Sequence, residues 1–222
     1  MNSPDRQEGG DMGLQRLPPG RHGLSREFVT QNQRDRLAAG MIATVAQRGY
    51  HETTISQIAA AAGVSRRTFY SYFDSKEACF FDSFSLLEEH LVEVMDDASK
   101  AERAWPSKVR AQLAAVLEEL SANPDLVRFA LIAPPAAGGP FLERYRAFLE
   151  RLVGAVADER PSKSKQPNEG VELAMAGGLA ALLVAKVNAG EGERLPELLP
   201  ELVELVLTPY LGHTQAAEQA RR

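Results

Sequence analysis

The chain has 222 residues, of which 44% are hydrophobic and 25% are charged, so it can bury the core of one large or two smaller globular domains. Its net charge of −5 disfavours a protein that coats nucleic acid without sequence preference. A single cysteine excludes an internal disulfide and fits a reducing cytoplasm. The opening residues hold no apolar secretory segment. The longest apolar run, residues 173–185, is shorter than the ~20 residues that a membrane-spanning helix needs, so we expect no membrane partner.

Residues 1–24 are rich in glycine and proline and contain few residues that can pack, which predicts a disordered N-terminal arm. Its arginines leave two interpretations open: a solvated tail, or a basic arm that reaches into a DNA minor groove. Ser25 is a favourable N-cap, and Gly49 follows Arg48, so the first long helix is expected between them.

Residues 53–80 have the pattern of two helices joined by a tight turn. Thr54 and Gln57 are spaced as a capping box for the first helix. Gly63 supplies the left-handed backbone that ends a helix cheaply, and Ser65 can cap the next helix. Phe69 and Phe73, four residues apart, mark the buried side of that second helix.

The other side of the second helix carries groups suited to DNA. Arg66 and Arg67 can form paired hydrogen bonds with guanine edges. The remaining candidates for DNA contact, mainly through phosphate oxygens, are Thr54, Ser65, Thr68, Tyr70, Tyr72 and Lys76. Alternatives stay open: the two arginines can be solvated surface charges, Tyr72 is as compatible with a core position, and Lys76 can be a simple surface charge.

The stretch GVSRRTFYSYFDSKEACF, residues 63–80, resembles the recognition segment of TetR-type transcriptional regulators. It has Gly-Val-Ser, a variable pair, an apolar residue, Tyr, an aromatic residue and Phe, then Lys-Glu after a short gap. The resemblance extends over residues 33–91, and Cys79 departs from it where many relatives have Leu. It implies an all-α fold with a helix-turn-helix head at residues 25–77 and a ligand-binding, dimerising body at residues 78–222. The head has seven basic and five acidic residues over 26–77, whereas residues 78–222 have 15 and 22.

Apolar spacing predicts the helices of the body. We expect them at residues 76–99, 107–122, 124–131 with Asn123 as N-cap, 141–159, 171–188 and 196–210, with a loop over 134–140 and a polar linker over 160–170. In the helix of 76–99, the acidic residues Glu88, Glu89, Glu93, Asp96 and Asp97 are expected to face solvent.

The last two helices are apolar around most of their circumference, so each must be buried on more than one side. The TetR resemblance implies that they form a four-helix bundle with a second copy of the chain; the alternative is that they complete a monomer core. An effector pocket is expected among the aromatic and Met side chains of the body: Trp105, Phe129, Phe141, Tyr145, Phe148 and Met175. Aromatic residues at helical spacing are also typical of a core.

Nothing in the sequence predicts catalysis, a cofactor or a metal ion. The four histidines have no metal-ligand spacing, and Cys79 lies between helix residues with no His close in sequence. We therefore expect a cytoplasmic, ligand-responsive repressor that binds a palindromic operator in double-stranded DNA as a homodimer, and not an enzyme. The alternatives are a helical small-molecule-binding protein with no operator function, and an enzyme on a helical scaffold.

Overall fold

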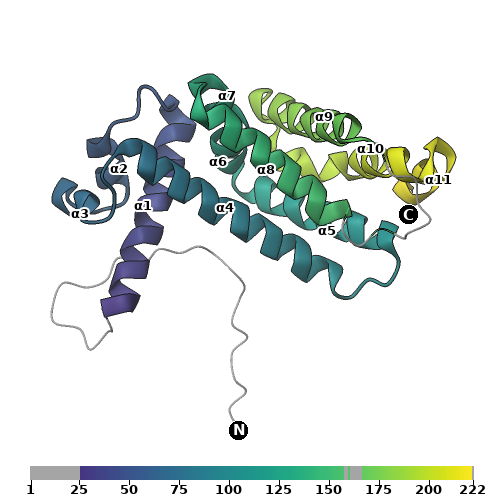
Figure 1. The fold of residues 1–222 in the computed structure, drawn as a ribbon, viewed down its shortest axis with the longest axis horizontal. Helices are drawn as coiled ribbons and strands as arrows, with labels where there is room; N and C mark the ends of the chain where they lie inside the picture. The colour runs from purple at the N-terminus through teal and green to yellow at the C-terminus, as the bar shows by residue number, and fades with distance from the viewer. Residues whose placement is uncertain (1–25, 158–159, 161–166, 222) are drawn as a thin grey trace, which may run out of the picture.

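The computed structural model describes residues 26–157, 160 and 167–221, and every regular element among them is helical (Figure 1). The expected all-α fold class is thereby confirmed. The predicted arm of residues 1–24, the expected cap Ser25 and much of the expected linker at 160–170 lie outside the described residues.

Three helices form the head: α1 (Arg26–Arg48), α2 (Ile55–Ala61) and α3 (Arg66–Tyr70). The capping box is present, because the Gln57 amide donates to Thr54 Oγ1 and the Thr54 amide donates to Gln57 Oε1 at 2.8 Å. Ser65 Oγ accepts from the Thr68 amide at 3.0 Å and caps α3. These side chains satisfy amides that would otherwise lack partners at the helix starts.

Helix α1 supports the other two helices of the head. Leu37 and Met41 on α1 and Ile58 on α2 are fully buried in one core. Gly40 allows the close approach, since a Cβ there would lie 2.8 Å from the Ile58 carbonyl oxygen and 2.9 Å from the Ala62 amide nitrogen. Short helices such as α2 and α3 depend on this packing for their stability.

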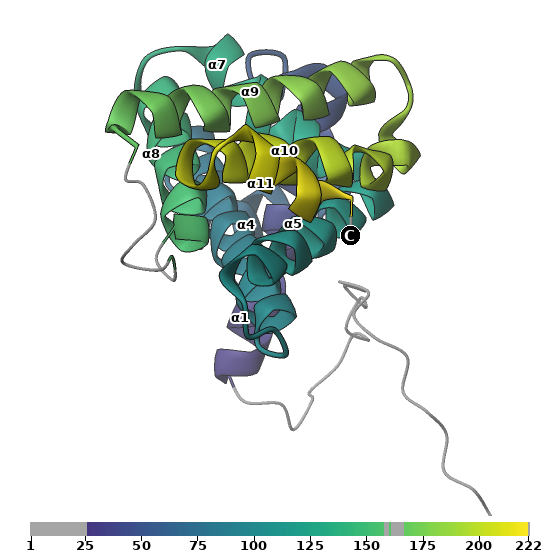
Figure 2. The ribbon, with the colours of Figure 1, turned by 90° about the vertical axis from the view of Figure 1, so that its right-hand side faces the viewer.

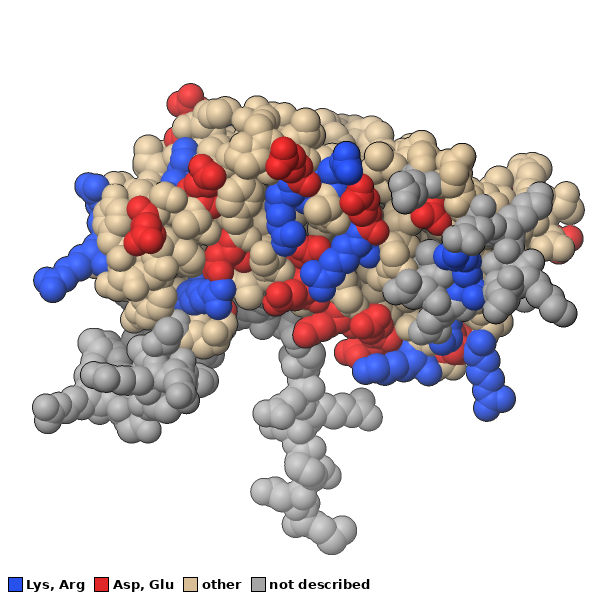
Figure 3. Space-filling view, in the orientation of Figure 1, with Lys and Arg blue, Asp and Glu red and all other residues tan. Residues whose placement is uncertain are grey.

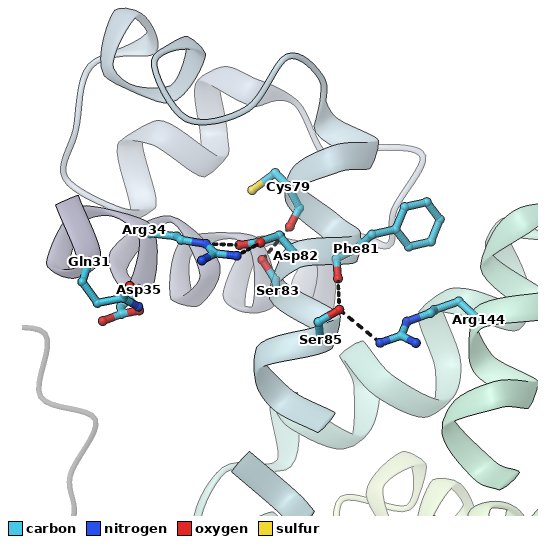
Figure 4. Close-up of polar contacts among 9 residues, drawn as sticks. All are labelled: Gln31, Arg34, Asp35, Cys79, Phe81, Asp82, Ser83, Ser85 and Arg144. Carbon is cyan, nitrogen blue, oxygen red and sulfur yellow. Dashed lines mark hydrogen bonds and ion pairs between the residues drawn. The ribbon is translucent and has the colours of Figure 1, made fainter. Parts of the chain in front are cut away.

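Helix α4 (Lys76–Ser99) has the expected bounds and runs from the head into the body (Figure 1). Arg34 of α1 forms an ion pair with Asp82 of α4, with Nε donating to Oδ2 at 2.9 Å (Figure 4). Cys79 and Phe80 of α4 are fully buried, so the head and the body share a continuous core.

The body comprises α5 (Trp105–Ala122), α6 (Pro124–Val127), a π-helical turn (Arg128–Ile132), α7 (Ala133–Ala137), α8 (Pro140–Ala157), α9 (Glu169–Asn188), a 3₁₀ segment (Gly192–Leu198), α10 (Leu199–Leu211) and α11 (His213–Ala220). The expected loop at 134–140 is wrong: Pro134 lies in the first turn of α7, where its missing amide costs nothing, and the helix ends at Gly138. Asn123 makes no side-chain cap, and α11 was not expected.

Helices α9 and α10 lie side by side across one face of the body (Figure 2). In α9, the segment Gly170–Asn188 is long and apolar enough to cross a membrane by length and composition, with only 22% of its most apolar window buried. This property was not predicted, because the uninterrupted apolar run of residues 173–185 is shorter than the segment. Val171, Leu173 and Leu182 are 37–40% exposed, which leaves an apolar surface on this face.

Candidate nucleic-acid interface and ligand cavity

Helix α3 presents its polar side outward at one end of the molecule, where basic side chains project (Figures 1 and 3). Arg66 and Arg67 are exposed, and their guanidinium groups have no hydrogen bond or ion pair with any described residue. Tyr70 is 49% exposed, an unusual position for a large aromatic side chain, and Thr54 is exposed at the start of α2. Four of the predicted DNA-contacting residues are thus exposed on the helix-turn-helix.

Buried contacts fix the orientation of α3. Phe69 is fully buried, and its ring lies 5.7 Å from that of Phe73, so the two aromatic residues define the inner side as predicted. Gly63 has φ +64°, and Arg36 of α1 donates to its carbonyl at 2.9 Å. A Cβ at Gly63 would lie 2.6 Å from Arg36 Nη2, so the turn needs glycine for its backbone and for this contact.

Three of the predicted phosphate ligands have partners within the head. Ser65 and Thr68 contact each other, with their hydroxyl oxygens 2.9 Å apart. Tyr72 is half-buried, and its hydroxyl donates to Gln33 Oε1 at 2.9 Å, which ties the end of α3 to α1. A phosphate contact would have to share or replace these hydrogen bonds, so the phosphate role of these residues stays a prediction.

Lys76 lies against the turn between α1 and α2. Its ammonium donates to the carbonyls of Tyr50 at 2.7 Å and Thr53 at 2.8 Å, and it lies 4.2 Å from the Tyr50 ring centroid. Burial lowers the pKa of Lys76, partly offset by the nearby charge of Glu52. The ammonium therefore stabilises the turn, and its phosphate role stays a prediction.

A cavity of about 100 Å³ lies in the body between α4, α5, α8, α9 and α10. Its lining is almost entirely aliphatic, with Leu149 and Val153 from α8, Leu179 from α9, and Met95 from α4. Gln112 of α5 is the polar residue among those that line it. Of the six pocket residues predicted from the sequence, Met175 alone lines this cavity.

The other five predicted pocket residues lie elsewhere. Phe129 and Phe148 are core residues, and the buried Trp105 donates to the Val156 carbonyl at 2.9 Å. Phe141 packs on Tyr50 of the head with ring centroids 4.3 Å apart, and Tyr145 lies on a shallow outer groove. Helical spacing places an aromatic side chain on an inward face but does not distinguish a filled core from a cavity.

Glu88 does not face solvent as predicted: it is 1% exposed. The cause is α8, which places two arginines over this position of α4. Arg144 pairs with Glu88 Oε2 and donates to Ser85 Oγ at 3.1 Å, and Arg151 Nη1 lies 3.3 Å from Glu88 Oε1 (Figure 4 shows the Ser85 contact). Charged residues alternate in sign over this part of the surface (Figure 3).

The described residues contain no group of three or more His, Cys, Asp or Glu side chains that could hold a metal ion. Burial raises the pKa of the Cys79 thiol to about 12, so it is protonated at neutral pH and is a poor nucleophile.

A helix-turn-helix with an outward-facing second helix, joined to a larger helical body, defines the class of helix-turn-helix regulators. The family model described as bacterial regulatory proteins of the tetR family matches residues 42–82. Residues 42–82 thus carry the N-terminal domain of tetR-family regulators, and the resemblance seen in the sequence is confirmed over this segment. No curated protein sequence matches it.

The same fold occurs in solved structures of low sequence identity. The fatty acid degradation regulator FadR from Bacillus halodurans superposes with a TM-score of 0.69 at 19% identity, over 78% of this chain and 97% of that one. FadR from Bacillus subtilis in complex with stearoyl-CoA superposes with a TM-score of 0.65 at 18% identity, over 78% of this chain and 97% of that one. A TetR-like transcriptional regulator from Rhodococcus sp. RHA1 superposes with a TM-score of 0.63 at 21% identity, over 87% of this chain and 97% of that one.

Proposed function

We propose that this protein is a cytoplasmic repressor that binds a palindromic operator as a homodimer and releases it when a small molecule occupies the body. The observation that carries the proposal is the exposed pair Arg66 and Arg67 on the outer side of α3, which have no partner among the described residues. The inner side of this helix is fixed by the buried Phe69. Exposed guanidinium groups on a helix held by buried contacts match the requirement for reading base edges in a major groove.

In this proposal, residues 25–77 form the DNA-binding head and residues 78–222 the regulatory body. Arg66 and Arg67 read bases, while Thr54 and Tyr70, both exposed, contact phosphates and set the position of the head on the duplex. Four further residues have two roles in this proposal: they stabilise the head through their own hydrogen bonds, and they bind a phosphate that comes within reach. These residues are Ser65, Thr68, Tyr72 and Lys76.

The second copy would pack on the face made by α9 and α10. Val171, Leu173 and Leu182 are exposed there, and the exposed residues between them include the small side chains Ala174 and Ala181. Small residues let two helices approach closely, and a shared apolar face explains why α9 is so little buried in one chain. Twofold pairing would place two α3 helices in successive major grooves, about 34 Å apart.

Helix α8 connects the cavity to the head, because it contacts both. Leu149 and Val153 of α8 line the cavity, Arg144 of the same helix pairs with Glu88 of α4, and Phe141 at its start packs on Tyr50. A ligand larger than the cavity must displace part of its wall. A shift of α8 would then act on α4 and on the α1–α2 turn, and so change the spacing of the two heads.

The effector in this proposal is mainly apolar, because the cavity wall is aliphatic. A fatty acyl compound is the first class to test, since two proteins of the same fold are named as regulators of fatty acid degradation or were solved with stearoyl-CoA. Release of DNA requires that the effector bind the released geometry more tightly than the DNA-bound one.

The proposal is tested by selecting bound duplexes from a randomised pool at two salt concentrations. We expect a twofold-symmetric motif whose enrichment survives the higher salt. Binding that is confined to low salt and enriches no motif would contradict operator recognition and favour a small-molecule-binding protein without an operator, provided that denatured protein releases no bound compound.

A further inference from the structure

Gln112 is an exception in the body cavity. The other residues that line the cavity are aliphatic or methionine, whereas Gln112 carries a primary amide with two N–H donors and one carbonyl acceptor. Gln112 is 4% exposed, so bulk water barely reaches it. Its amide has no hydrogen-bond partner among the residues that the structure describes. Its amide atoms are not among the fully buried atoms that lack a partner, so they keep some accessible surface, and their position on a cavity wall leaves them open to a group that enters the cavity.

The charge of the lining also limits what can enter. Among the described residues that line the cavity, none is Lys, Arg, His, Asp or Glu. A carboxylate or ammonium placed there would lose its hydration without gaining a counter-charge, which is far more costly than burying a neutral group. A pure hydrocarbon would avoid that cost but would leave the Gln112 amide without a partner.

We propose that Gln112 is the specificity-determining residue of this cavity, and that the ligand is an apolar molecule whose buried part carries one neutral hydrogen-bonding group. A carbonyl fits best, because its oxygen can accept from the Gln112 amide nitrogen while the rest of the molecule contacts the aliphatic wall. This inference rests on the proposed effector site, and it adds the chemical class that the site selects: ketone, ester or thioester over hydrocarbon and over free acid.

Three small probes of one shape test the proposal. 2-Pentanone, 2-methyl-1-pentene and butanoate share a propyl chain and a three-atom head, and they differ in whether the head is a neutral carbonyl, a hydrocarbon or an anion. Each has about as many non-hydrogen atoms as benzene, which occupies an engineered apolar cavity of about 150 Å³. The cavity here, at about 100 Å³, is smaller, but its wall includes the flexible Met95 and Met175.

Dissociation constants of the three probes are measured by NMR titration of the full chain without DNA, for the wild type and for Gln112→Leu. For the wild type we expect the ketone to bind more tightly than butanoate. Gln112→Leu should weaken the ketone about two- to tenfold, the fold-change of one lost hydrogen bond, and leave the alkene as tight or tighter. Gln215→Leu, at an exposed position of α11, is the control and should change neither.

Equal losses for ketone and alkene would overturn the proposal, because Gln112 would then only shape the wall. An unchanged ketone affinity, or no binding of any probe to the wild type, would overturn it as well. If the helical circular dichroism signal shows that the Leu variant is unfolded, Gln112→Met replaces it, because Met is unbranched like Gln. Because no DNA is present, a failure here is separate from a failure of operator selection: either result can stand without the other.

Discussion

At the scale of single residues, the pair on α3 decides whether the head reads sequence. Arg67→Ala should weaken binding to the selected operator by about 1–3 kcal/mol and relax the preference at one base position, because a bidentate contact to a base is lost. The measurement is a titration with the selected duplex, followed by renewed selection with the variant. Arg103→Ala removes an exposed arginine from the α4–α5 connection and serves as the control. An unaltered motif with unaltered affinity would contradict base reading by Arg67.

Lys76 offers a choice between two roles. Lys76→Met keeps the length of the side chain but removes the donors from the carbonyls of Tyr50 and Thr53. We expect the free energy of unfolding to fall by about 1–2 kcal/mol, as for a charged hydrogen-bond donor at a partly open site, which chemical denaturation measures. The opposite result would be unchanged stability and weaker binding to all duplexes alike, with the slope of log binding constant against log salt concentration reduced by about one. It would show that the ammonium acts mainly on a phosphate.

Cys79 is expected to be inert. Its pKa is raised to about 12 by burial, against about 9 for an accessible thiol, so folding keeps the thiol protonated. The contribution of Cys79 to the free energy of unfolding is fully present below pH 9 and is lost as the pH rises from about 9 to 12, because the thiol then ionises in the unfolded chain but not in the folded one. Iodoacetamide should modify the native chain at pH 8 far more slowly than the denatured chain. Equal rates would mean that the thiol is accessible.

At the scale of elements, α8 holds the body to α4 through the buried Glu88. Arg144→Leu leaves this carboxylate with Arg151 as its remaining charged partner among the described residues. We expect the free energy of unfolding to fall by about 1–3 kcal/mol, because a buried charge loses part of its compensation.

The same helix supplies a matched control for that prediction. Arg146 is 69% exposed and pairs with Glu150, itself 51% exposed, four residues along α8. Arg146→Leu should change stability by less than about 0.5 kcal/mol, since exposed pairs contribute little. Chemical denaturation of both variants makes the comparison. Equal effects would mean that the contact between α8 and α4 is an ordinary surface ion pair.

The elements differ in how well their sequence predicts them. The bounds of α4, the capping box at Thr54 and the turn at Gly63 follow from local chemistry, and all three were predicted. α7 was not predicted because two adjacent prolines are typical of a loop, although Pro in a first helical turn is tolerated. α11 was missed because a short polar helix has little apolar periodicity of its own.

Features that arise between elements were beyond the sequence. The burial of Glu88 depends on two arginines more than 50 residues away, and the need for Gly40 depends on how closely α2 crosses α1. The cavity is the clearest case: Met175 was predicted, but Gln112 and the aliphatic lining were not. A single polar residue within the apolar spacing of α5 was the signal that could have indicated it.

At the scale of the whole molecule, the exposed apolar face of α9 predicts a dimer. Leu182→Arg places a charge on that face and should convert the dimer to a monomer at micromolar concentration, because the buried contact cannot compensate an unpaired charge. Analytical ultracentrifugation measures the mass. Ala101→Arg, in the exposed connection between α4 and α5, is the control and should remain dimeric. A Leu182→Arg variant with wild-type mass would place the dimer contact elsewhere, or rule it out.

Docking of a dimer on the operator is tested by comparing affinity for the selected operator with affinity for the same operator carrying about five extra base pairs between its halves. Two heads held about 34 Å apart by one dimer can both dock only when the half-sites lie about one helical turn, 10–10.5 base pairs, apart. We predict that the half-turn insertion reduces affinity to that of a single half-site and that about ten inserted base pairs do not restore it, because the half-sites then lie two turns apart. Equal affinity for all three duplexes would contradict a dimeric operator-binding repressor.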